Sequence, residues 1–178
     1  MTERIIIAGS GGQGVMLLGK VLAQAAMAEG KYVTWLPAYG PEVRGGTSHC
    51  MVTISGQEIG SPYINKADTL IILNNPSLKR FSARVKDKGL LVLNSSLAKA
   101  GPDKRVKTLQ FPFTDIAIKL GNIKVANMVA LGCYLREKET VKIKKMLEVF
   151  RVMSPAGRKD ILEVNEKALQ EGAELVDG

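Results

Sequence analysis

The chain has 178 residues, enough for one domain with a sizeable hydrophobic core but short for two. Hydrophobic residues make up 46% of it and charged residues 24%, as in ordinary globular proteins. No apolar run approaches the roughly 18 residues of a membrane-spanning helix. Since Met1 to Arg4 leads directly into an apolar stretch with no room for a signal peptide, we expect a cytoplasmic protein without a membrane contact.

The net charge is +8, from 25 Lys and Arg against 17 Asp and Glu. Such a surface attracts anionic partners, whether nucleic acid, phosphorylated cofactor or acidic protein. Many of the lysines fall in amphipathic stretches late in the chain, where a solvated helix face explains them. Aromatic residues are only 5%, so the sequence shows no base-stacking platform, and a nucleic-acid-binding module would rest on charge alone.

Residue types that carry redox or metal chemistry are scarce. Cys50 and Cys133 are the only cysteines and lie far apart, and His49 is the only histidine. A cluster or a structural zinc ion needs several such ligands. We therefore expect no metal site and no catalytic residue in this chain, and we expect both cysteines to be buried as small hydrophobes.

The first chemically informative stretch joins a strand at residues 5–7 to a helix at residues 15–29. Between them Gly9, Gly11 and Gly14 fit the pattern G-x-G-x-x-G in the strand–loop–helix context that gives it meaning. Glycines there allow a tight turn and let a phosphate approach the free N–H groups of the helix start. The alternative is a loop that closes a strand onto a helix without a ligand. The candidate binding residues in this loop are Gly9, Gly11, Gly12, Gln13 and Gly14.

Residues 32–36 predict a second strand, which completes a β-α-β unit. A nicotinamide-binding domain places an acid near the end of that strand, to hold the ribose hydroxyl. This chain has Leu36, Pro37 and Ala38 there instead, so NAD is disfavoured.

The loop at residues 37–47 combines prolines and glycines with charged side chains. Arg44, Gly45 and Gly46 are candidates for a second clamp on phosphate or carboxylate. An ion pair between Arg44 and Glu42 that pins the loop is the alternative, and the sequence leaves both open.

Residues 47–55 alternate as a strand, with His49, Met51 and Thr53 on one face; a turn at residues 55–58 then predicts a hairpin. No helix separates this strand from the previous one, so we expect a mixed sheet.

Polar residues after later strands, Asn74 and Asn94 among them, lie where open α/β sheets bind ligands, although helix capping is enough to explain each of them singly. Further strands are expected at residues 69–73, 89–94 and 105–109, and helices at residues 77–85, 114–120, 125–135, 143–150 and 160–175.

These elements predict one α/β domain over residues 1–178, with a Rossmann-like, doubly wound, mostly parallel mixed sheet, helices on both faces and C-terminal helices over about 123–176. The helix at 125–135 is apolar nearly all round. We expect a core position to cover part of it and a subunit interface to cover the rest.

With both glycine segments in view, the chain resembles the gamma subunit, or gamma domain, of the 2-oxoacid:ferredoxin oxidoreductases. The resemblance is carried by Gly-Ser-Gly-Gly-Gln-Gly at 9–14, Tyr-Gly-Pro-Glu-Val-Arg-Gly-Gly at 39–46 and Ile-Gly-Ser-Pro at 59–62, and the stretch from Asn127 to Gly132 is similar to the family's late helix. It looks more like the 2-oxoglutarate and general 2-oxoacid branches than the pyruvate branch.

The resemblance implies a complex that decarboxylates a 2-oxoacid on thiamine diphosphate, passes electrons through iron–sulfur clusters to ferredoxin and forms acyl-CoA. It implies that these cofactors lie on alpha, beta and ferredoxin-like delta partner subunits, while this chain binds none alone and helps to form the CoA access site. The alternative is a free-standing Rossmann-like nucleotide-binding oxidoreductase. Since we expect both glycine loops to leave the carboxyl edge of adjacent strands, they should face each other across one crevice.

Overall fold

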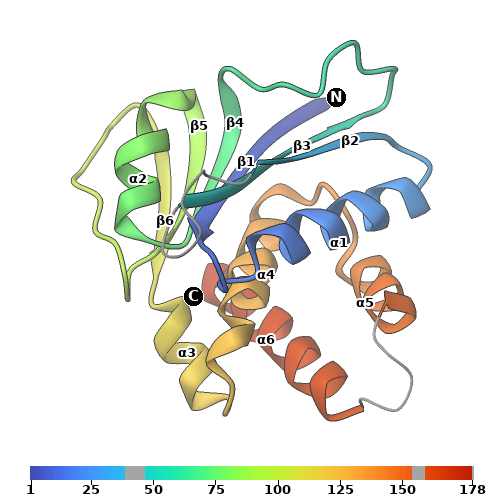
Figure 1. Ribbon diagram of the computed structural model, residues 1–178, viewed down its shortest axis with the longest axis vertical. Coiled ribbons are helices and arrows are strands. Elements are labelled where there is room, and N and C mark those ends of the chain that lie inside the picture. Colours follow the sequence, from blue (N-terminus) through green and yellow to red (C-terminus); the bar gives the residue numbers. More distant parts are fainter. Residues whose placement is uncertain (39–46, 154–158, 178) are drawn as a thin grey trace.

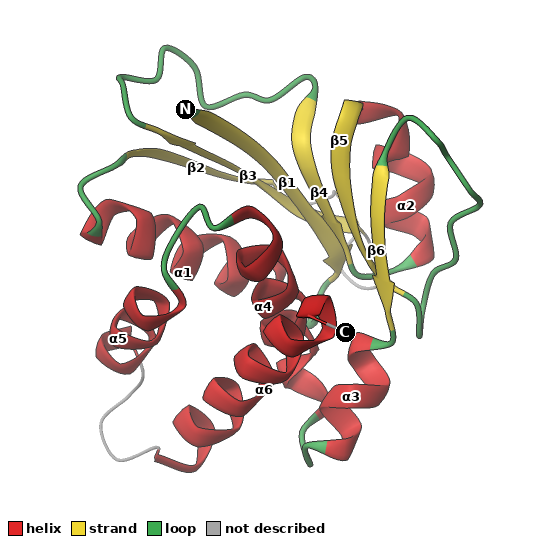
Figure 2. Ribbon diagram, turned by 180° about the vertical axis from the view of Figure 1, so that it is seen from behind, coloured by secondary structure: helices red, strands yellow, loops and turns green. Residues whose placement is uncertain are grey.

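The fold is organised around one mixed sheet. The computed structural model describes residues 1–38, 47–153 and 159–177, and within these ranges six strands pair in the order β2-β3-β1-β4-β5-β6. Figure 1 and Figure 2 show the sheet from opposite directions, with a thick layer of helices on one face and a thin layer on the other. The expected α/β class is confirmed, as are the mostly parallel mixed sheet and the helices on both faces.

Parallel pairing builds one side of the sheet and antiparallel pairing the other. The parallel strands are β1 (Thr2–Ser10), β4 (Ala67–Ile72), β5 (Val85–Asn94) and β6 (Lys107–Phe111). On the other side, β3 (Thr47–Ser55) lies antiparallel between β1 and β2 (Tyr32–Ala38). Ser10 pairs with Thr47 and Ala38 with His49, so β1 and β2 end at the same edge.

The expectation that β1 and β2 are adjacent is therefore wrong, because β3 separates them. Residues 39–46 alone connect β2 to β3, too few for the crossover that a parallel neighbour needs, so β3 returns antiparallel. Its side chains are buried on both faces, as in a central strand. The turn after Ser55 does not form the expected hairpin, since β4 pairs with the opposite side of β1. The antiparallel partners of β3 are β2 and β1 instead.

The two faces of the sheet carry unequal cover. On one face, α1 (Val15–Ala28) and α4 (Ala126–Lys138) pack against the strands. The helices α3 (Phe113–Lys119), α5 (Ile143–Met153) and α6 (Lys159–Asp177) pack on those two helices and complete this layer, while the opposite face packs against α2 (Asn75–Phe81). Short turns of 3-10 helix, η1 (Ser82–Arg84) and η2 (Ile123–Val125), join neighbouring elements. The apolar run of β1 serves both cores: Ile5 and Ile7 face the thick layer, and Ile6 and Ala8 face α2.

Helix α4 is covered within this chain, which corrects the expectation that a subunit interface covers part of it. Every residue from Asn127 to Leu135 is buried, and α6 supplies most of the cover. The two helices approach closely because each has a glycine at the contact. A Cβ on Gly132 of α4 would lie 1.9 Å from the Leu169 carbonyl oxygen, and a Cβ on Gly172 of α6 would lie 1.9 Å from the Val129 carbonyl oxygen. Figure 2 shows α6 lying against α4.

Candidate functional site

The β1–α1 loop owes its path to two glycines with a left-handed backbone. Gly12 has φ +91° and Gly14 has φ +74°, values that a side chain disfavours. Gly14 also lies against α4, where a Cβ would come 2.3 Å from Asn127 Nδ2. That amide donates to the Gly14 carbonyl oxygen at 3.2 Å. Asn127, from the late helix named in the resemblance, therefore fixes the start of α1 from the other end of the chain.

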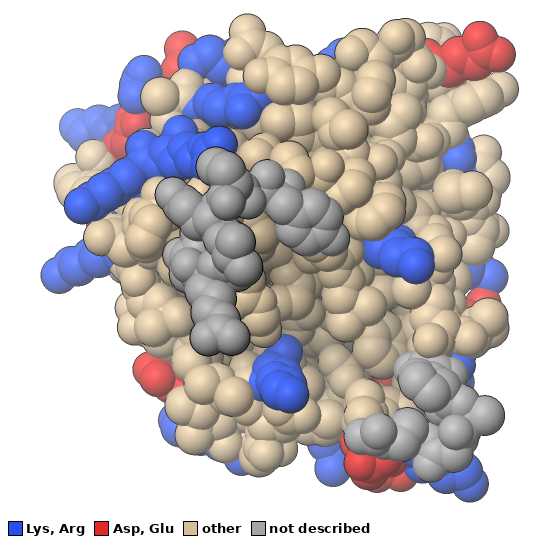
Figure 3. Space-filling view, viewed as in Figure 1, with Lys and Arg blue, Asp and Glu red and all other residues tan. Residues whose placement is uncertain are grey.

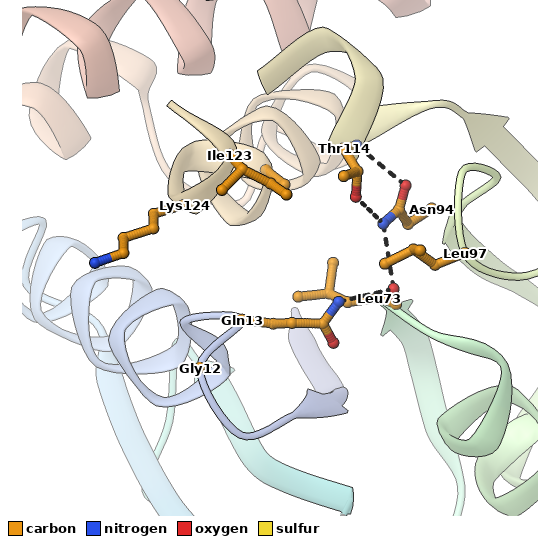
Figure 4. A pocket seen from close by; sticks show the side chains of 9 residues that line it. Gly12, Gln13, Leu73, Asn94, Leu97, Thr114, Ile123 and Lys124 are labelled. Atoms are coloured by element: carbon orange, nitrogen blue, oxygen red, sulfur yellow. Dashed lines mark hydrogen bonds between the residues drawn. The ribbon is translucent and has the colours of Figure 1, made fainter. Parts of the chain in front are cut away.

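The Gln13 side chain folds back and holds the loop. Its Oε1 accepts from the Ser10 backbone N–H at 2.7 Å, and its Nε2 donates to the Leu73 carbonyl oxygen at 3.3 Å (Figure 4). Gly9 makes room for it, because a Cβ there would lie 2.7 Å from Gln13 Oε1. Both ends of the Gln13 amide are thus occupied within the chain.

Gly11 differs from the other glycines of the loop. Its backbone is not left-handed, and a Cβ would meet no atom within 4 Å. The residue is exposed at the tip of the loop. Nothing in the described part of the chain requires glycine here, whereas close approach of a ligand or partner would require it.

The first turn of α1 offers unpaired backbone donors. Gly14, the N-cap, gives no side-chain cap, and the turn carries no acidic residue. The first N–H groups of a helix have no intrahelical partner, and the helix dipole makes this end partly positive. An anion near Gly12 would therefore be stabilised.

A pocket of about 160 Å³ opens beside this loop at the carboxyl edge of the sheet. Figure 4 shows its lining side chains, which come from the loop, the ends of β4 and β5, the start of α3 and η2. The pocket is lined by Gly12, Gln13, Leu73, Asn94, Leu97, Thr114, Ile123, Lys124 and Ala126. Most of this wall is apolar, with Lys124 as its only charged side chain among the described residues.

Asn94 anchors the wall of the pocket opposite the loop. It is fully buried, and its Nδ2 donates to the Leu73 carbonyl oxygen at 3.2 Å and to Thr114 Oγ1 at 2.8 Å. Its Oδ1 accepts from the backbone N–H groups of Ser96 and Thr114. The Leu73 carbonyl oxygen thus accepts hydrogen bonds from both Gln13 and Asn94, and these bonds connect the ends of β1, β4 and β5.

Lys124 brings a positive charge to the rim. It lies in η2, is exposed, and extends toward the α1 side of the pocket in Figure 4. Sequence reasoning missed both Lys124 and Thr114. A signal was present for neither, because η2 and α3 reach this edge only through tertiary packing.

The predicted site residues divide into two groups. Gly9, Gly11, Gly12, Gln13 and Gly14 lie together beside the pocket. Arg44, Gly45 and Gly46, with the alternative ion pair to Glu42, lie outside the described residues. The flanking positions Ala38 and Thr47 are at the same edge of the sheet as the loop. Asn74 caps α2, with its Oδ1 accepting from the Ser77 N–H at 3.0 Å, as capping chemistry predicts.

Burial accounts for the state of the thiols. It raises the pKa of Cys50 and of Cys133 to about 12, and both are buried, as expected. Burial, followed by the charges of Arg80 and Arg84, lowers the pKa of His49, which packs on the α2 side against Phe81.

Across residues 1–38, 47–153 and 159–177, no three His, Cys, Asp or Glu side chains come together as metal ligands, and no helix is long and apolar enough to cross a membrane.

The mixed sheet, with a glycine loop and a pocket at its carboxyl edge, places this chain in the class of Rossmann-like α/β proteins. Residues 4–175 match the family model described as pyruvate ferredoxin/flavodoxin oxidoreductase. The chain belongs to this family.

Named relatives cover almost the whole chain. It is 41% identical over 171 residues to the ketoisovalerate oxidoreductase subunit VorA of Methanothermobacter thermautotrophicus, covering 96% of this chain but 36% of that protein. It is 35% identical over 169 residues to the 2-oxoglutarate synthase subunit KorC of Archaeoglobus fulgidus, covering 87% of this chain and 88% of that one. The chain therefore spans about a third of the first relative and most of the second.

Among solved structures, the gamma subunit of a keto/oxoacid ferredoxin oxidoreductase from Geobacter sulfurreducens superimposes with a TM-score of 0.84 at 31% identity. The match covers 97% of both chains. The resemblance inferred from the two glycine segments is thus confirmed at the level of the family.

Proposed function

We propose that this chain is the gamma subunit of a complex that converts a 2-oxoacid and CoA to acyl-CoA and carbon dioxide, with ferredoxin as electron acceptor. The match in length and fold to a gamma subunit, over 97% of both chains, carries the proposal. The named relatives are themselves described as subunits. Thiamine diphosphate and the iron–sulfur clusters would lie on alpha, beta and ferredoxin-like delta partners.

The role of this chain would be to complete the CoA access site. CoA joins phosphate groups to a long, largely uncharged arm. Gly11, Gly12 and the first turn of α1 offer donors to a phosphate, Lys124 offers a cation, and the apolar pocket beside them suits the arm. Arg44, Gly45 and Gly46 would supply the second clamp. The match to proteins described as oxidoreductase subunits supports this function over a free-standing nucleotide-binding oxidoreductase.

Assembly with partner subunits tests the first half of the proposal. The chain, co-expressed with the alpha, beta and delta subunits, should co-elute with them in fixed stoichiometry. The assembled complex should reduce ferredoxin with CoA and one member of a panel of 2-oxoacids, and the isolated chain should not. Elution as a free chain that reduces a nicotinamide or flavin nucleotide would overturn the proposal.

Kinetics of the assembled complex test the second half. Arg44→Ala and Lys124→Ala should each raise the KM for CoA at least about tenfold, as expected for the loss of one charge-assisted contact of about 1.5–3 kcal/mol. The KM for the 2-oxoacid should stay unchanged. Arg136→Ala is the matched control, because Arg136 is paired with Asp177 at the far end of α4. Unchanged CoA kinetics in both variants would leave the loop without a ligand.

A further inference from the structure

Exposed apolar side chains gather at the carboxyl edge of the sheet. The large hydrophobic residues that stand exposed in the described part of the chain include Leu17, Leu97, Ile118 and Ile123, at 42%, 46%, 55% and 57% exposure. All four belong to elements that meet at or beside the pocket. Soluble monomers expose such residues singly, and a cluster of them marks an interaction site.

The four residues share one neighbourhood. Leu97 and Ile123 line the same pocket. Ile118 is on α3, which contacts η2 where Ile123 lies. Leu17 is in the first turn of α1, directly after the loop that forms another wall of the pocket. Two of these exposed apolar side chains therefore line the pocket, and the other two belong to elements that adjoin it.

The charge around this cluster is predominantly positive. The segments that carry it, residues 11–20, 95–101 and 113–126, contain Lys20, Lys99, Lys119 and Lys124 but a single acid, Asp115. Figure 3 shows a broad uncharged area over the middle of the molecule, with separate blue groups around it and red groups mainly at the margins. We call these four apolar residues and four lysines the carboxyl-edge surface.

We propose that the carboxyl-edge surface is the docking face for a partner subunit whose own face is apolar at its centre and rimmed with carboxylates. This inference rests on the proposed function and adds which face of the chain the partner covers. The apolar side chains supply the area that stabilises the contact, and the lysines supply charge complementarity, which accelerates and orients association.

Two observations favour a protein over a small ligand. A pocket of about 160 Å³ receives part of one small molecule, yet Ile118 and Leu17 stand outside its lining. In the relative VorA the matching region is 36% of a longer chain, so in that protein this domain is covalently joined to a larger polypeptide segment. A partner seated on the surface would also close the pocket and exclude water from it, and would lie against Gly11.

A second copy of this chain is the competing occupant. Helix α6 has acidic net charge, although Glu166 and Asp177 pair with Arg151 and Arg136. Against two lysines it carries Asp160, Glu163, Glu166, Glu171, Glu174 and Asp177. Its apolar residues Ala168, Leu169 and Ala173 are buried against α4, however, so α6 offers charge without an apolar centre.

The test compares apolar-to-serine substitutions on the carboxyl-edge surface with one outside it. Leu97→Ser with Ile123→Ser removes two apolar side chains from the surface, and Val152→Ser removes one from α5, where Val152 is 86% exposed. We expect the double variant to bind the remaining subunits at least about tenfold more weakly by sedimentation or calorimetry, because central apolar residues dominate interface energetics. Val152→Ser should bind like wild type. Both variants should still unfold in a single cooperative transition like that of the wild type, since each changed side chain is at least 46% exposed.

Charge reversal separates the electrostatic part. Lys20→Glu with Lys119→Glu should slow association and flatten its dependence on salt, while dissociation changes little. Equal affinity of wild type and the serine double variant for the partner subunits would overturn the docking face while leaving the proposed function intact. Binding of no partner by wild type would overturn both. A concentration-dependent dimer that the double variant abolishes, with complex assembly unchanged, would assign the surface to a second copy instead.

Discussion

Glycines occur in two regions of this chain for opposite reasons. Where α4 crosses α6, a Cβ on Gly132 or Gly172 would strike a backbone carbonyl oxygen at 1.9 Å, so these glycines exist for contacts inside the chain. At the tip of the β1–α1 loop, a Cβ on Gly11 would meet nothing within 4 Å. A glycine explained by internal packing reports on the fold. Internal packing does not explain Gly11, and its place beside the pocket makes a ligand or partner the candidate reason for it.

Gly132→Ala should have the largest effect, and it should fall on the fold. Overpacking typically costs about 1–3 kcal/mol when the neighbouring side chains can adjust. Here the added Cβ would clash with backbone atoms, which cannot move aside as a side chain can. We expect a loss of more than about 3 kcal/mol in the free energy of unfolding, measured by urea denaturation. Gly101→Ala is the control, because Gly101 is exposed with open space beside it. Similar stability of the two variants would show that the helices separate easily.

Gly14→Ala should come second, since it combines the two kinds of constraint. Its left-handed backbone costs about 1–3 kcal/mol for another residue, and its Cβ would lie 2.3 Å from Asn127 Nδ2. Adding Asn127→Ala should recover the steric part of the loss but not the backbone part. A double-mutant cycle in thermal unfolding measures both, and strictly additive losses would contradict the contact.

Gly11→Ala should leave the fold intact and act only on binding. The isolated chain should be unchanged or up to about 1 kcal/mol more stable, because alanine restricts the unfolded chain. In the assembled complex the same change should raise the KM for CoA or weaken subunit association. Gly101→Ala should match it in stability and leave both binding measurements at wild-type values. Wild-type binding by Gly11→Ala would remove the functional reason for this glycine.

The effect that is smallest near neutral pH is a pH dependence that reports on the core beneath the loop. Burial raises the pKa of the Cys50 thiol from 9.0 to about 12, so the native state keeps a proton that the unfolded state loses. Stability should therefore fall as pH rises from about 9 toward 12. The slope of melting temperature against pH should be shallower in Cys50→Ala than in wild type. Equal slopes would contradict the burial of Cys50.

The sequence was sufficient for everything encoded locally. The apolar run of β1, the glycines at 9–14 and the following amphipathic helix predicted the strand, loop and helix correctly. The missing connecting helix after Ala38 predicted the mixed sheet. Glycine spacing also led to the correct family, because the two segments occur in a fixed order.

What the sequence did not predict depends on contacts between distant segments. The position of β3 between β1 and β2 depends on burial of both its faces, and the cover of α4 depends on α6, which begins after residue 158. The inward turn of Gln13 depends on the Leu73 carbonyl oxygen, and the place of Lys124 depends on how η2 packs. Periodicity reports on local structure and carries none of this information.

The insertion of β3 has a consequence for the tolerance of this protein to changes in chain length. Residues 39–46 span two points that strand pairing holds in place, Ala38 opposite His49 and Thr47 opposite Ser10. Joining two fixed points costs loop-closure entropy that grows only logarithmically, about 0.6 kcal/mol for each doubling of length. The sheet therefore places no tight limit on the length of this segment, and the strands on either side should keep their register when residues are inserted there.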